Sequence, residues 1–349
     1  MIYIALPTTS AEEKDATRHE GAGRRLSFYL AMEEHVARRL NTGDDCFFMW
    51  QTRPTVIFGR NQLIENEVNL DFCREHGIEM YRRKSGGGCV YSDMGNVMFS
   101  YVTRDENVNF TFNRYINLVA LVLHRLGIEA KASGRNDVLI KTPSAPLSRG
   151  EAEWRKVSGN AFYHIPGHSI VHGTMLYDTN MENMVGAITP SNEKLVSKGV
   201  ESVRQHIALL KDHTDVTLDE FKAFVRRNLC NSELTLTAED IRCIEEKEQE
   251  YLSDEFIYGR NPHYSITRRK RLEGVGEMEA RMELKNGVIK RINLLGDFFV
   301  VGDLDNQLLN RLRNVGLTEE ALQEVLPNRL DDIILHLDRS AFISFLTEP

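Results

Sequence analysis

The sequence predicts an α/β protein of the α+β type with two domains, 1–250 and 251–349. Through the first domain, amphipathic helical segments alternate with short apolar runs that are typical of strands. After the charged stretch Glu245–Glu250 the pattern changes to three successive strand-like runs, which are followed by helices. The length of 349 residues suits two domains of ordinary size.

Helices are predicted where apolar residues recur at helical spacing and where caps or glycines mark the ends. Asn69 is a plausible N-cap for one of them, and Gly77 and Gly127 are plausible stops. The predicted helices are 24–40, 70–76, 111–126, 217–230, 237–253, 304–314, 318–325 and one at the end of the chain.

Strands are predicted at apolar runs that are bounded by turn residues. The Arg53-Pro54 turn joins two of them, Pro166-Gly167 suits a type II turn, and Asn286-Gly287 marks a hairpin. Residues 141–153 are expected to form a surface loop. The predicted strands are 46–50, 55–58, 78–82, 89–91, 97–102, 138–140, 159–165, 168–176, 264–269, 278–284 and 288–295.

Composition narrows the class of protein. Apolar residues make up 42% and charged residues 27%, which is ordinary for a globular protein. The net charge of −8 argues against a general nucleic-acid binder. A signal peptide and an apolar run of about 18 residues are both missing, and the five cysteines lack C-x-x-C spacing. The sequence therefore predicts a cytoplasmic protein with reduced thiols and with neither nucleic acid nor membrane as a partner.

A glycine-rich stretch, Arg82-Arg83-Lys84-Ser85-Gly86-Gly87-Gly88, is the strongest local signal. Three glycines allow close approach of a ligand, and their N–H groups can form a concavity that binds an anion. Neighbouring cationic side chains would add charge-assisted bonds to phosphate. The alternative is a hairpin turn with exposed basic residues, and composition alone gives the two about equal weight. The stretch is not a Walker A loop, because no Gly-Lys-Ser/Thr ending opens a helix.

Other polar residues lie at predicted strand ends. Lys156 precedes Gly159 at the entrance of a strand and could pair with a phosphate or polarise a carbonyl. Asn136 and Asp137 follow Gly134-Arg135. The asparagine could form a hydrogen bond with a base or a phosphate, and the aspartate could bind Mg²⁺ or a lysine. Taken one at a time, a surface lysine and an ordinary turn are the favoured interpretations.

Two further candidates, for a metal site and for a nucleophile, are better explained by structural roles. The histidines His164, His168 and His172 have the four-residue spacing of a helical metal site, but Pro166-Gly167 breaks any such helix. Cys89 follows the glycines, yet the sequence around it identifies no activating base, so a small buried thiol is the better interpretation.

Together these motifs resemble the lipoate–protein ligases. The resemblance runs in register from residue 25 to about 205 and rests on six pieces. They are Gly59-Arg60-Asn61-Gln62, the stretch from Arg82 to Asn96, Gly134–Asp137, Lys156-Val157-Ser158-Gly159-Asn160-Ala161, Val171-His172-Gly173-Thr174-Met175-Leu176 and Lys198-Gly199-Val200-Glu201-Ser202-Val203.

The resemblance implies a fold and a reaction. The fold is the catalytic domain shared with biotin ligases, a mixed sheet flanked by helices, with a small α+β accessory domain after about residue 250. The enzyme would activate lipoate with ATP and Mg²⁺ to lipoyl-AMP and release pyrophosphate. It would then transfer the lipoyl group to a lysine of apo E2 lipoyl domains or of the glycine-cleavage H protein.

Site residues follow from the matched motifs. The resemblance makes Lys156 the catalytic lysine, in contact with nucleotide phosphate and lipoate carboxylate, and Asp137 a ligand of Mg²⁺. Lipoate would be bound by Arg83, Lys156, His172, Gly173 and Thr174. The nucleotide or adenylate would be bound by Arg83, Ser85, Gly86, Gly87, Gly88, Cys89, Val90, Tyr91, Asn96, Asn136, Asp137 and Lys156.

The sequence departs from the family pattern at three positions beside these motifs. Val171 replaces the first histidine of H-H-G-T, Ser92 replaces a common histidine, and Cys89 replaces a usual alanine. The first two put the preference between lipoate and octanoate in question. The alternatives are an acyltransferase of the same fold, which needs a catalytic cysteine where residues 141–176 contain none, and a non-catalytic lipoate-binding member. A biotin ligase would carry a different Gly-Arg-Gly-containing loop.

Overall fold

The computed structural model describes residues 1–7, 24–40, 43–62, 64–105, 107–133, 136–142, 153–188, 206–258, 266–285 and 287–347. The chain divides into two compact units. The first unit comprises Met1–Ile57, Val68–Tyr81 and Val90–Ser253, and the second comprises Phe58–Glu67, Arg82–Cys89 and Asp254–Pro349. The second unit therefore takes in two segments from the N-terminal half of the chain.

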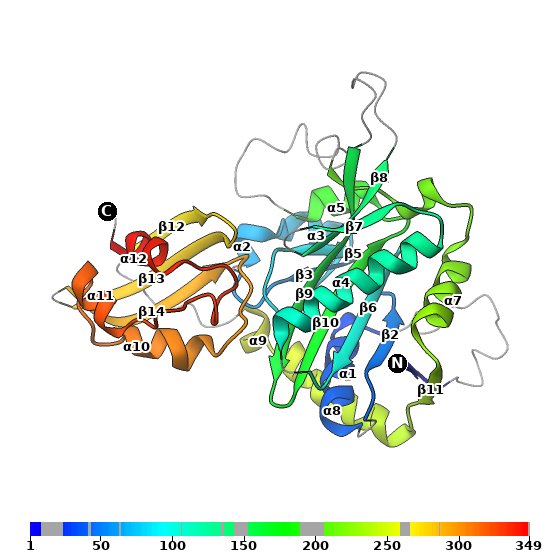
Figure 1. Ribbon diagram of the computed structural model, residues 1–349, viewed down its shortest axis with the longest axis horizontal. Coiled ribbons are helices and arrows are strands. Elements are labelled where there is room, and N and C mark those ends of the chain that lie inside the picture. The colour runs from blue at the N-terminus through cyan, green and yellow to red at the C-terminus, as the bar shows by residue number, and fades with distance from the viewer. Residues whose placement is uncertain are drawn as a thin grey trace. The chain divides into compact units, whose positions relative to one another are not determined.

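A mixed sheet of eight strands forms the centre of the first unit, with the order β11-β1-β2-β6-β10-β9-β8-β7 (Figure 1). Strand β1 is parallel to both of its neighbours, and the remaining pairs are antiparallel. This confirms the expected mixed sheet. The strands are β1 (Ile2–Ala5), β2 (Cys46–Trp50), β6 (Asn96–Thr103), β7 (Ala130–Ala132), β8 (Asp137–Thr142), β9 (Glu153–Ile165), β10 (His168–Leu176) and β11 (Ser232–Thr235).

Helices cover both faces of this sheet. Phe162 on β9 packs against Phe112 of α4 (Val108–Arg125), with ring centroids 4.8 Å apart. His172 on β10 contacts Glu33 of α1 (Leu26–Arg39) from the other face, because its neighbour Val171 is the residue paired with Phe162. The other helices of this unit are α3 (Leu70–Glu75), α5 (Met181–Ala187), the 3₁₀ turn η1 (Leu210–His213), α7 (Leu218–Leu229) and α8 (Ala238–Leu252).

Local sequence explains where several helices begin. The Asn69 side chain accepts the N–H of Phe72 at the start of α3, which confirms it as an N-cap. Thr217 and Thr237 form capping boxes with Glu220 and Asp240 at the starts of α7 and α8. Among the helices that the structure describes, none is long and apolar enough to cross a membrane.

A second, three-stranded sheet carries the glycine-rich stretch. Its order is β4-β3-β5, from β3 (Thr55–Phe58), β4 (Glu79–Arg82) and β5 (Val90–Ser92). The glycines connect β4 to β5, as predicted. The predicted strands 46–50 and 55–58 are β2 and β3, and although a turn joins them as expected, they lie in different sheets. The intervening Gln51–Pro54 therefore carries the chain from one sheet to the other.

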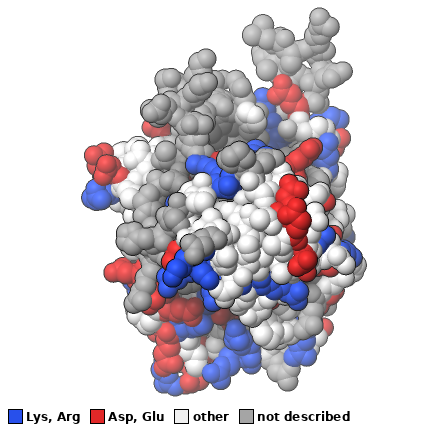
Figure 2. Space-filling view, turned by 90° about the vertical axis from the view of Figure 1, so that its left-hand side faces the viewer, with Lys and Arg blue, Asp and Glu red and all other residues white. Residues whose placement is uncertain are grey.

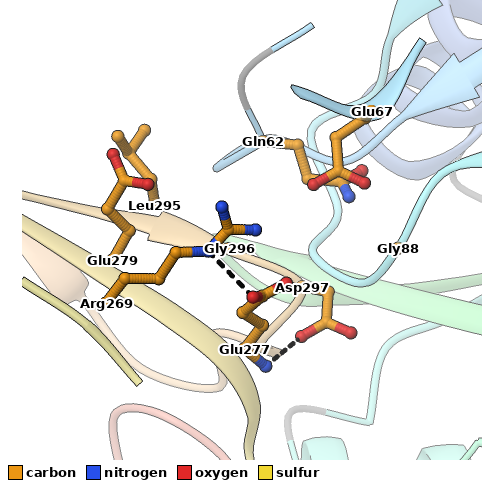
Figure 3. Close-up of a pocket in the computed structure, with 9 residues that line it drawn as sticks. All are labelled: Gln62, Glu67, Gly88, Arg269, Glu277, Glu279, Leu295, Gly296 and Asp297. Carbon is orange, nitrogen blue, oxygen red and sulfur yellow. Dashed lines mark hydrogen bonds and ion pairs between the residues drawn. The ribbon is translucent and has the colours of Figure 1, made fainter. Parts of the chain in front are cut away.

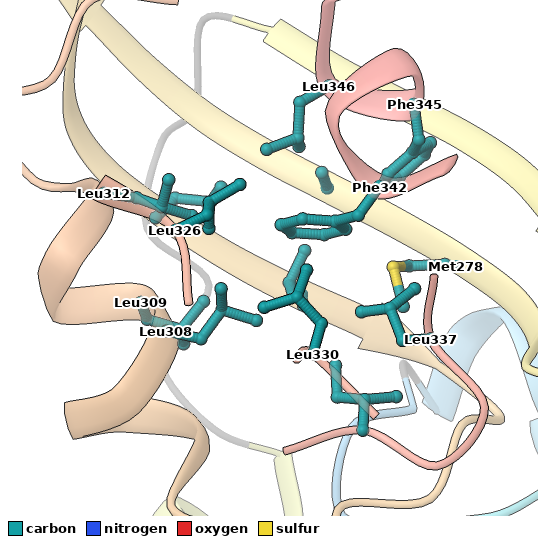
Figure 4. Close-up of a cluster of buried hydrophobic side chains, with 14 of the residues drawn as sticks. Met278, Leu308, Leu309, Leu312, Leu326, Leu330, Leu337, Phe342, Phe345 and Leu346 are labelled. Atoms are coloured by element: carbon teal, nitrogen blue, oxygen red, sulfur yellow. The ribbon is translucent and has the colours of Figure 1, made fainter. Parts of the chain in front are cut away.

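The second unit contains an antiparallel sheet with one helical face. Its strands are β12 (Ile266–Leu272), β13 (Gly276–Lys285) and β14 (Val288–Gly296). Alternate residues Met278, Ala280 and Met282 of β13 are fully buried, and they meet the helical residues Leu308, Leu312 and Phe342 in one core (Figure 4). The helices are α2 (Ile64–Glu67), α9 (Asp254–Tyr258), the π-helical η2 (Asp305–Leu309), α10 (Asn310–Leu312), α11 (Glu319–Val325) and α12 (Arg339–Thr347). The side of this unit that faces the viewer in Figure 2 carries basic and acidic groups around an uncharged area.

Candidate functional site

Lys156 lies inside β9 and points toward a carboxylate on the adjacent strand β8. Its Nζ is 2.8 Å from Oδ1 of Asp137, and both side chains are partly exposed, at 37% and 27%. The strand begins at Glu153, so Lys156 stands further inside it than the sequence indicated. A rigid sheet therefore presents a cation to solvent, beside a carboxylate.

Asparagine and glycine residues hold the strands next to this ion pair. The Asn136 side chain donates to the carbonyl of Asn160, and the Asn160 side chain donates to the carbonyl of Asn136, each at 3.0 Å. The Asn160 amide oxygen lies directly against Gly173, where a Cβ would come within 1.8 Å of it. The Thr174 hydroxyl bonds to the backbone N and O of Gly159 at 3.2 and 3.4 Å. Asn160 therefore connects Asn136 with Gly173, and Thr174 is bound to Gly159, the glycine that lies against Lys156.

His172 belongs to a buried polar chain on the face of the sheet that α1 covers, and this is also the face of Gly159, because His172 pairs with Ala161 two residues further along β9. Its Nδ1 is 3.0 Å from both carboxylate oxygens of Glu33. Ser100 donates to Glu33 Oε1 at 2.6 Å, and the Trp50 indole donates to Ser100 at 2.9 Å. The Glu33 carboxylate is fully buried, and these partners offset the loss of its hydration. Burial, followed by the Glu33 charge, raises the pKa of Tyr115 above its ordinary value.

Arg83 organises the glycine loop from within the second unit. It is 4% exposed, and its guanidinium donates to the carbonyls of Gly86 and Gly88 at 2.6 and 2.7 Å and to Ser85 Oγ at 2.9 Å. Burial lowers the pKa of Arg83 to about 10, which leaves it cationic at neutral pH. Gly87 has φ +85°, a conformation that favours glycine. The loop is therefore fixed around a buried cation.

Backbone groups near the C-terminal sheet also touch this loop. The Gly87 N–H donates to the Phe298 carbonyl at 3.2 Å, and a Cβ on Gly86 would come within 2.3 Å of the same oxygen. The carbonyl of Asn61 accepts the Gly296 N–H at 2.8 Å. In both contacts a glycine, in the loop or at Gly296, allows the two backbones to come close together.

An acidic cavity of about 80 Å³ lies in the second unit (Figure 3). Burial, together with the charges of Asp297 and Glu277, raises the pKa of Glu67 to about 7. Arg269 pairs with Glu277 at 2.8 Å, and the Asp297 carboxylate accepts the N–H of Glu277 at 2.6 Å. The cavity is lined by Gln62, Glu67, Gly88, Arg269, Glu277, Glu279, Leu295, Gly296 and Asp297.

Comparison with known families gives this arrangement a context. Residues 26–230 match the model of the Lipoyl protein ligase A/B catalytic domain. Residues 261–346 match the model of the Bacterial lipoate protein ligase C-terminus. The chain belongs to the lipoate–protein ligase family. Its activity is that of a lipoate–protein ligase, and the first match alone spans more than half of the sequence.

Individual relatives agree. The ligase is 32% identical to the lipoate-protein ligase LplJ of Bacillus subtilis over 310 residues, which cover 85% of this chain and 90% of the relative. It is 25% identical to a bi-partite ligase of Thermoplasma acidophilum from a structural study of that ligase and its E2 lipoyl domain, with a TM-score of 0.61 over 76% of this chain and 98% of that one. A lipoate-protein ligase A bound with ATP is also 25% identical, with a TM-score of 0.58 over 74% of this chain and 98% of that one.

Other predicted site residues of the ligase have structural partners. Asn96 is fully buried and its amide donates to Thr179 Oγ1 at 3.1 Å. Tyr91 is buried in β5, beside the half-exposed Val90, and Cys89 is half-buried at the end of the glycine loop. Burial raises the pKa of the Tyr91 hydroxyl above its ordinary value. Gly134, Arg135 and Lys198–Val203, which contributed to the resemblance, lie outside the described residues.

The contact between Asp137 and Lys156 argues against the predicted role of Asp137 as a metal ligand. Its Oδ1 contacts the ammonium of Lys156 at 2.8 Å, so a cation bound at that oxygen would be repelled by the lysine. Mg²⁺ is usually held by one or two carboxylates together with phosphate oxygens. Where the ligase is described, no cluster of three or more acidic, histidine or cysteine side chains suits a metal ion. As placed, Asp137 fits a partner of Lys156 better than a metal ligand.

Sequence reasoning missed the buried chain that joins His172 to Trp50. Glu33 was part of a predicted helix, but it was not recognised as a residue near a candidate site. A signal was present, because Glu33 lies three residues from both Leu30 and Val36 on the apolar side of that helix. A carboxylate on a buried helical face requires partners, and here they come from β6 and β10.

Proposed function

We propose that this ligase activates lipoate with ATP and Mg²⁺, forming lipoyl-AMP and releasing pyrophosphate, and then acylates an acceptor lysine. The observation that carries the proposal is the Lys156 ammonium, which a rigid sheet holds beside Asp137, Gly159 and Thr174. The relative that was solved with ATP bound supports the use of a nucleotide. ATP would bring Mg²⁺ to the reaction, and we assign no residue of this chain as its ligand.

In the first step the lipoate carboxylate attacks the α-phosphorus of ATP, and the bond to pyrophosphate breaks. Two anions must therefore approach each other, which Coulomb repulsion opposes. A cation between the carboxylate and the phosphate reduces this repulsion and stabilises the charge that develops in the transition state. Lys156 is the proposed source of this cation. The same ammonium orients both reactants without a covalent enzyme intermediate.

In the second step the acceptor lysine, as a free amine, attacks the acyl carbonyl of lipoyl-AMP. The amide bond forms, AMP leaves, and the amine loses a proton. We propose E2 lipoyl domains and the glycine-cleavage H protein as acceptors. The T. acidophilum relative, studied together with its E2 lipoyl domain, supports the first of these.

We propose that the glycine loop binds nucleotide phosphate and that His172, Gly173 and Thr174 line the lipoyl site. What supports this role is the buried arginine that binds the loop carbonyls, together with three successive glycines that allow close approach of a ligand. His172 and Thr174 are both 5% exposed, which suits the wall of a narrow apolar site. A cytoplasmic location, catalysis in residues 1–250 and an accessory role for 251–349 complete the proposal.

ATP–pyrophosphate exchange with and without lipoate tests the proposal. We expect exchange that depends on lipoate and that Lys156→Ala reduces by about 10²–10³-fold, the range for loss of one charge-stabilising group. The matched control is Lys141→Ala, which removes an exposed lysine of β8 that pairs with Glu129 instead. A folded protein without exchange would contradict acid activation and favour an acyltransferase or a non-catalytic binder.

A further inference from the structure

We propose that Asp137 is a positioning residue that acts through Lys156. Its carboxylate holds the lysine ammonium over Gly159, on a strand face that a β-bulge at Val157 makes available. This inference rests on the proposed role of Lys156 in acid activation and deepens it. It also gives Asp137 a task other than metal binding.

The bulge is visible in the register between β8 and β9. Asp137 pairs with Gly159 and Val138 with Ser158, but Leu139 pairs with Lys156. Val157 is therefore an extra residue in β9, with no counterpart in β8. Consecutive residues of a regular strand point to opposite faces. An inserted residue interrupts this alternation, so the residues before and after Val157 no longer alternate as they would in a regular strand.

This extra residue decides which way Lys156 points. Lys156 and Gly159 are three positions apart, so a regular strand would place them on opposite faces of the sheet. The bulge shifts the alternation by one residue. Lys156 consequently shares a face with Asp137 and Gly159, and its ammonium reaches the Asp137 carboxylate. Bulges are known to redirect side chains beside active sites in this way.

Gly159 provides the surface on which the lysine rests. A Cβ built at this position would lie 2.8 Å from both Cε and Nζ of Lys156. Any larger residue would therefore displace the ammonium. The Thr174 hydroxyl anchors the Gly159 backbone from the next strand, so this surface is fixed.

Asp137 is itself held in place before any ligand binds. Its backbone N–H donates to Ser133 Oγ at 2.9 Å, and its carbonyl accepts the Ser133 N–H at 2.7 Å. A free lysine side chain has about 2 kcal/mol of rotamer entropy to lose when it is ordered. An ion pair that orders the lysine in advance reduces the loss that must accompany binding of the two anionic substrates.

Full-length Asp137→Asn tests the proposal. In lipoate-dependent ATP–pyrophosphate exchange, we expect kcat to fall by about 10²-fold, as for a misplaced catalytic group, with an unchanged half-saturating Mg²⁺ concentration. Gly159→Ala should also lower kcat, because its Cβ would come within 2.8 Å of the Lys156 Nζ and shift the ammonium. Asp137→Glu, which keeps the charge, should recover part of the rate.

A second measurement does not depend on activity. Wild type and Asp137→Asn are treated with an amine-reactive acylating reagent, and the modification of Lys156 is followed by peptide mass spectrometry. We expect Asp137→Asn to raise this rate severalfold because the ammonium loses its partner. Glu129→Gln is the matched control, since it breaks the Lys141–Glu129 pair, which has the same 2.8 Å separation. It should leave both exchange and Lys156 modification unchanged.

Two results would overturn the inference. A higher Mg²⁺ requirement in Asp137→Asn would identify a metal ligand, and an unchanged modification rate would show that the carboxylate does not restrain Lys156. If wild type shows no exchange but Asp137→Asn still accelerates modification, the positioning role stands and the proposed function fails. The two failures are thereby distinguishable.

Discussion

His172 Nδ1 lies 3.0 Å from both carboxylate oxygens of Glu33, in a part of the first unit where both side chains are almost completely buried. Glu33 also accepts a hydrogen bond from Ser100 at 2.6 Å. One helical carboxylate thus connects residues from two strands, β6 and β10. The buried donors around Glu33 need this carboxylate as an acceptor. A buried donor without an acceptor has lost its hydrogen bonds to water and gained none in return, which destabilises the fold.

We expect Glu33→Ala to lower the free energy of unfolding by about 1–3 kcal/mol for each donor that it leaves unpaired. Urea denaturation measures this change. The exposed Glu75 of α3 supplies the control, and Glu75→Ala should change stability by less than about 0.5 kcal/mol. The KM for lipoate should also rise in Glu33→Ala if His172 lines the acyl site. Equal stability of the two variants would contradict the structural role of the buried chain.

The Asn160 side chain lies so close to Gly173 that no residue larger than glycine fits at position 173. A Cβ at Gly173 would lie 1.8 Å from Asn160 Oδ1, a contact that real structures do not allow. We expect Gly173→Ala to lower the melting temperature and the rate of lipoate-dependent exchange. The second substitution Asn160→Ala removes that oxygen and should restore part of the melting temperature. A double variant no more stable than Gly173→Ala would show that the contact with Asn160 is not the cause.

The Glu67 carboxyl predicts a dependence of stability on pH. Its pKa is raised from 4.5 to about 7 by burial and by the charges of Asp297 and Glu277, against the opposing effects of Gln62 and Arg269. The folded state therefore binds more protons than the unfolded state between these pH values. Stability from this group is complete below pH 4.5 and is lost as pH rises through about 7. The loss amounts to about 3 kcal/mol at most.

Thermal unfolding of Glu67→Gln at several pH values checks this sign. We expect the variant to match wild type near pH 5 and to be more stable at pH 8, because glutamine stays neutral throughout. Glu324→Gln, on the exposed side of α11, is the control and should follow wild type at every pH. A Glu67→Gln variant less stable than wild type at pH 8 would contradict the raised pKa.

Arg83 is expected to resist conservative replacement. Its guanidinium bonds to two carbonyls and a hydroxyl of the glycine loop, a set that the single ammonium of lysine cannot match. Arg83→Lys should therefore raise the KM for ATP about tenfold or more in the exchange assay, a change equivalent to about 1.4 kcal/mol. The matched variant Arg74→Lys alters an exposed pair in α3 and should leave KM unchanged. Equal ATP KM values for both variants would refute a role for the loop in nucleotide binding.

The sequence predicted much of the fold because local signals agreed with the structure. Asn69 caps α3, and the predicted strands 46–50 and 55–58 have the bounds of β2 and β3. Sheet membership was beyond local pattern, since it depends on pairing between distant strands. The start of β9 was also missed, because the strand opens with charged, partly exposed residues around Trp154 rather than with an apolar run.

For the candidate site, the sequence pointed to individual residues but not to the contacts between them. Motif order made Lys156 and Asp137 candidate site residues, but the sequence could not show that these two residues contact each other. The contact depends on the bulge at Val157, and a one-residue shift of register leaves no periodic trace in so short a segment. The partners of Asn96 and His172 were missed for a related reason, because Thr179 and Glu33 come from distant parts of the chain.

The hydrogen bond from the Gly87 amide to the Phe298 carbonyl carries a thermodynamic consequence. An anion that takes this amide must displace an acceptor that is already in place, so the two compete for one donor. Linkage then makes the competition reciprocal: whatever releases the Phe298 carbonyl tightens phosphate binding, and phosphate binding favours release by the same factor. Under the proposed function, the affinity of the loop for a nucleotide is thus set partly by a residue more than two hundred positions away in the chain.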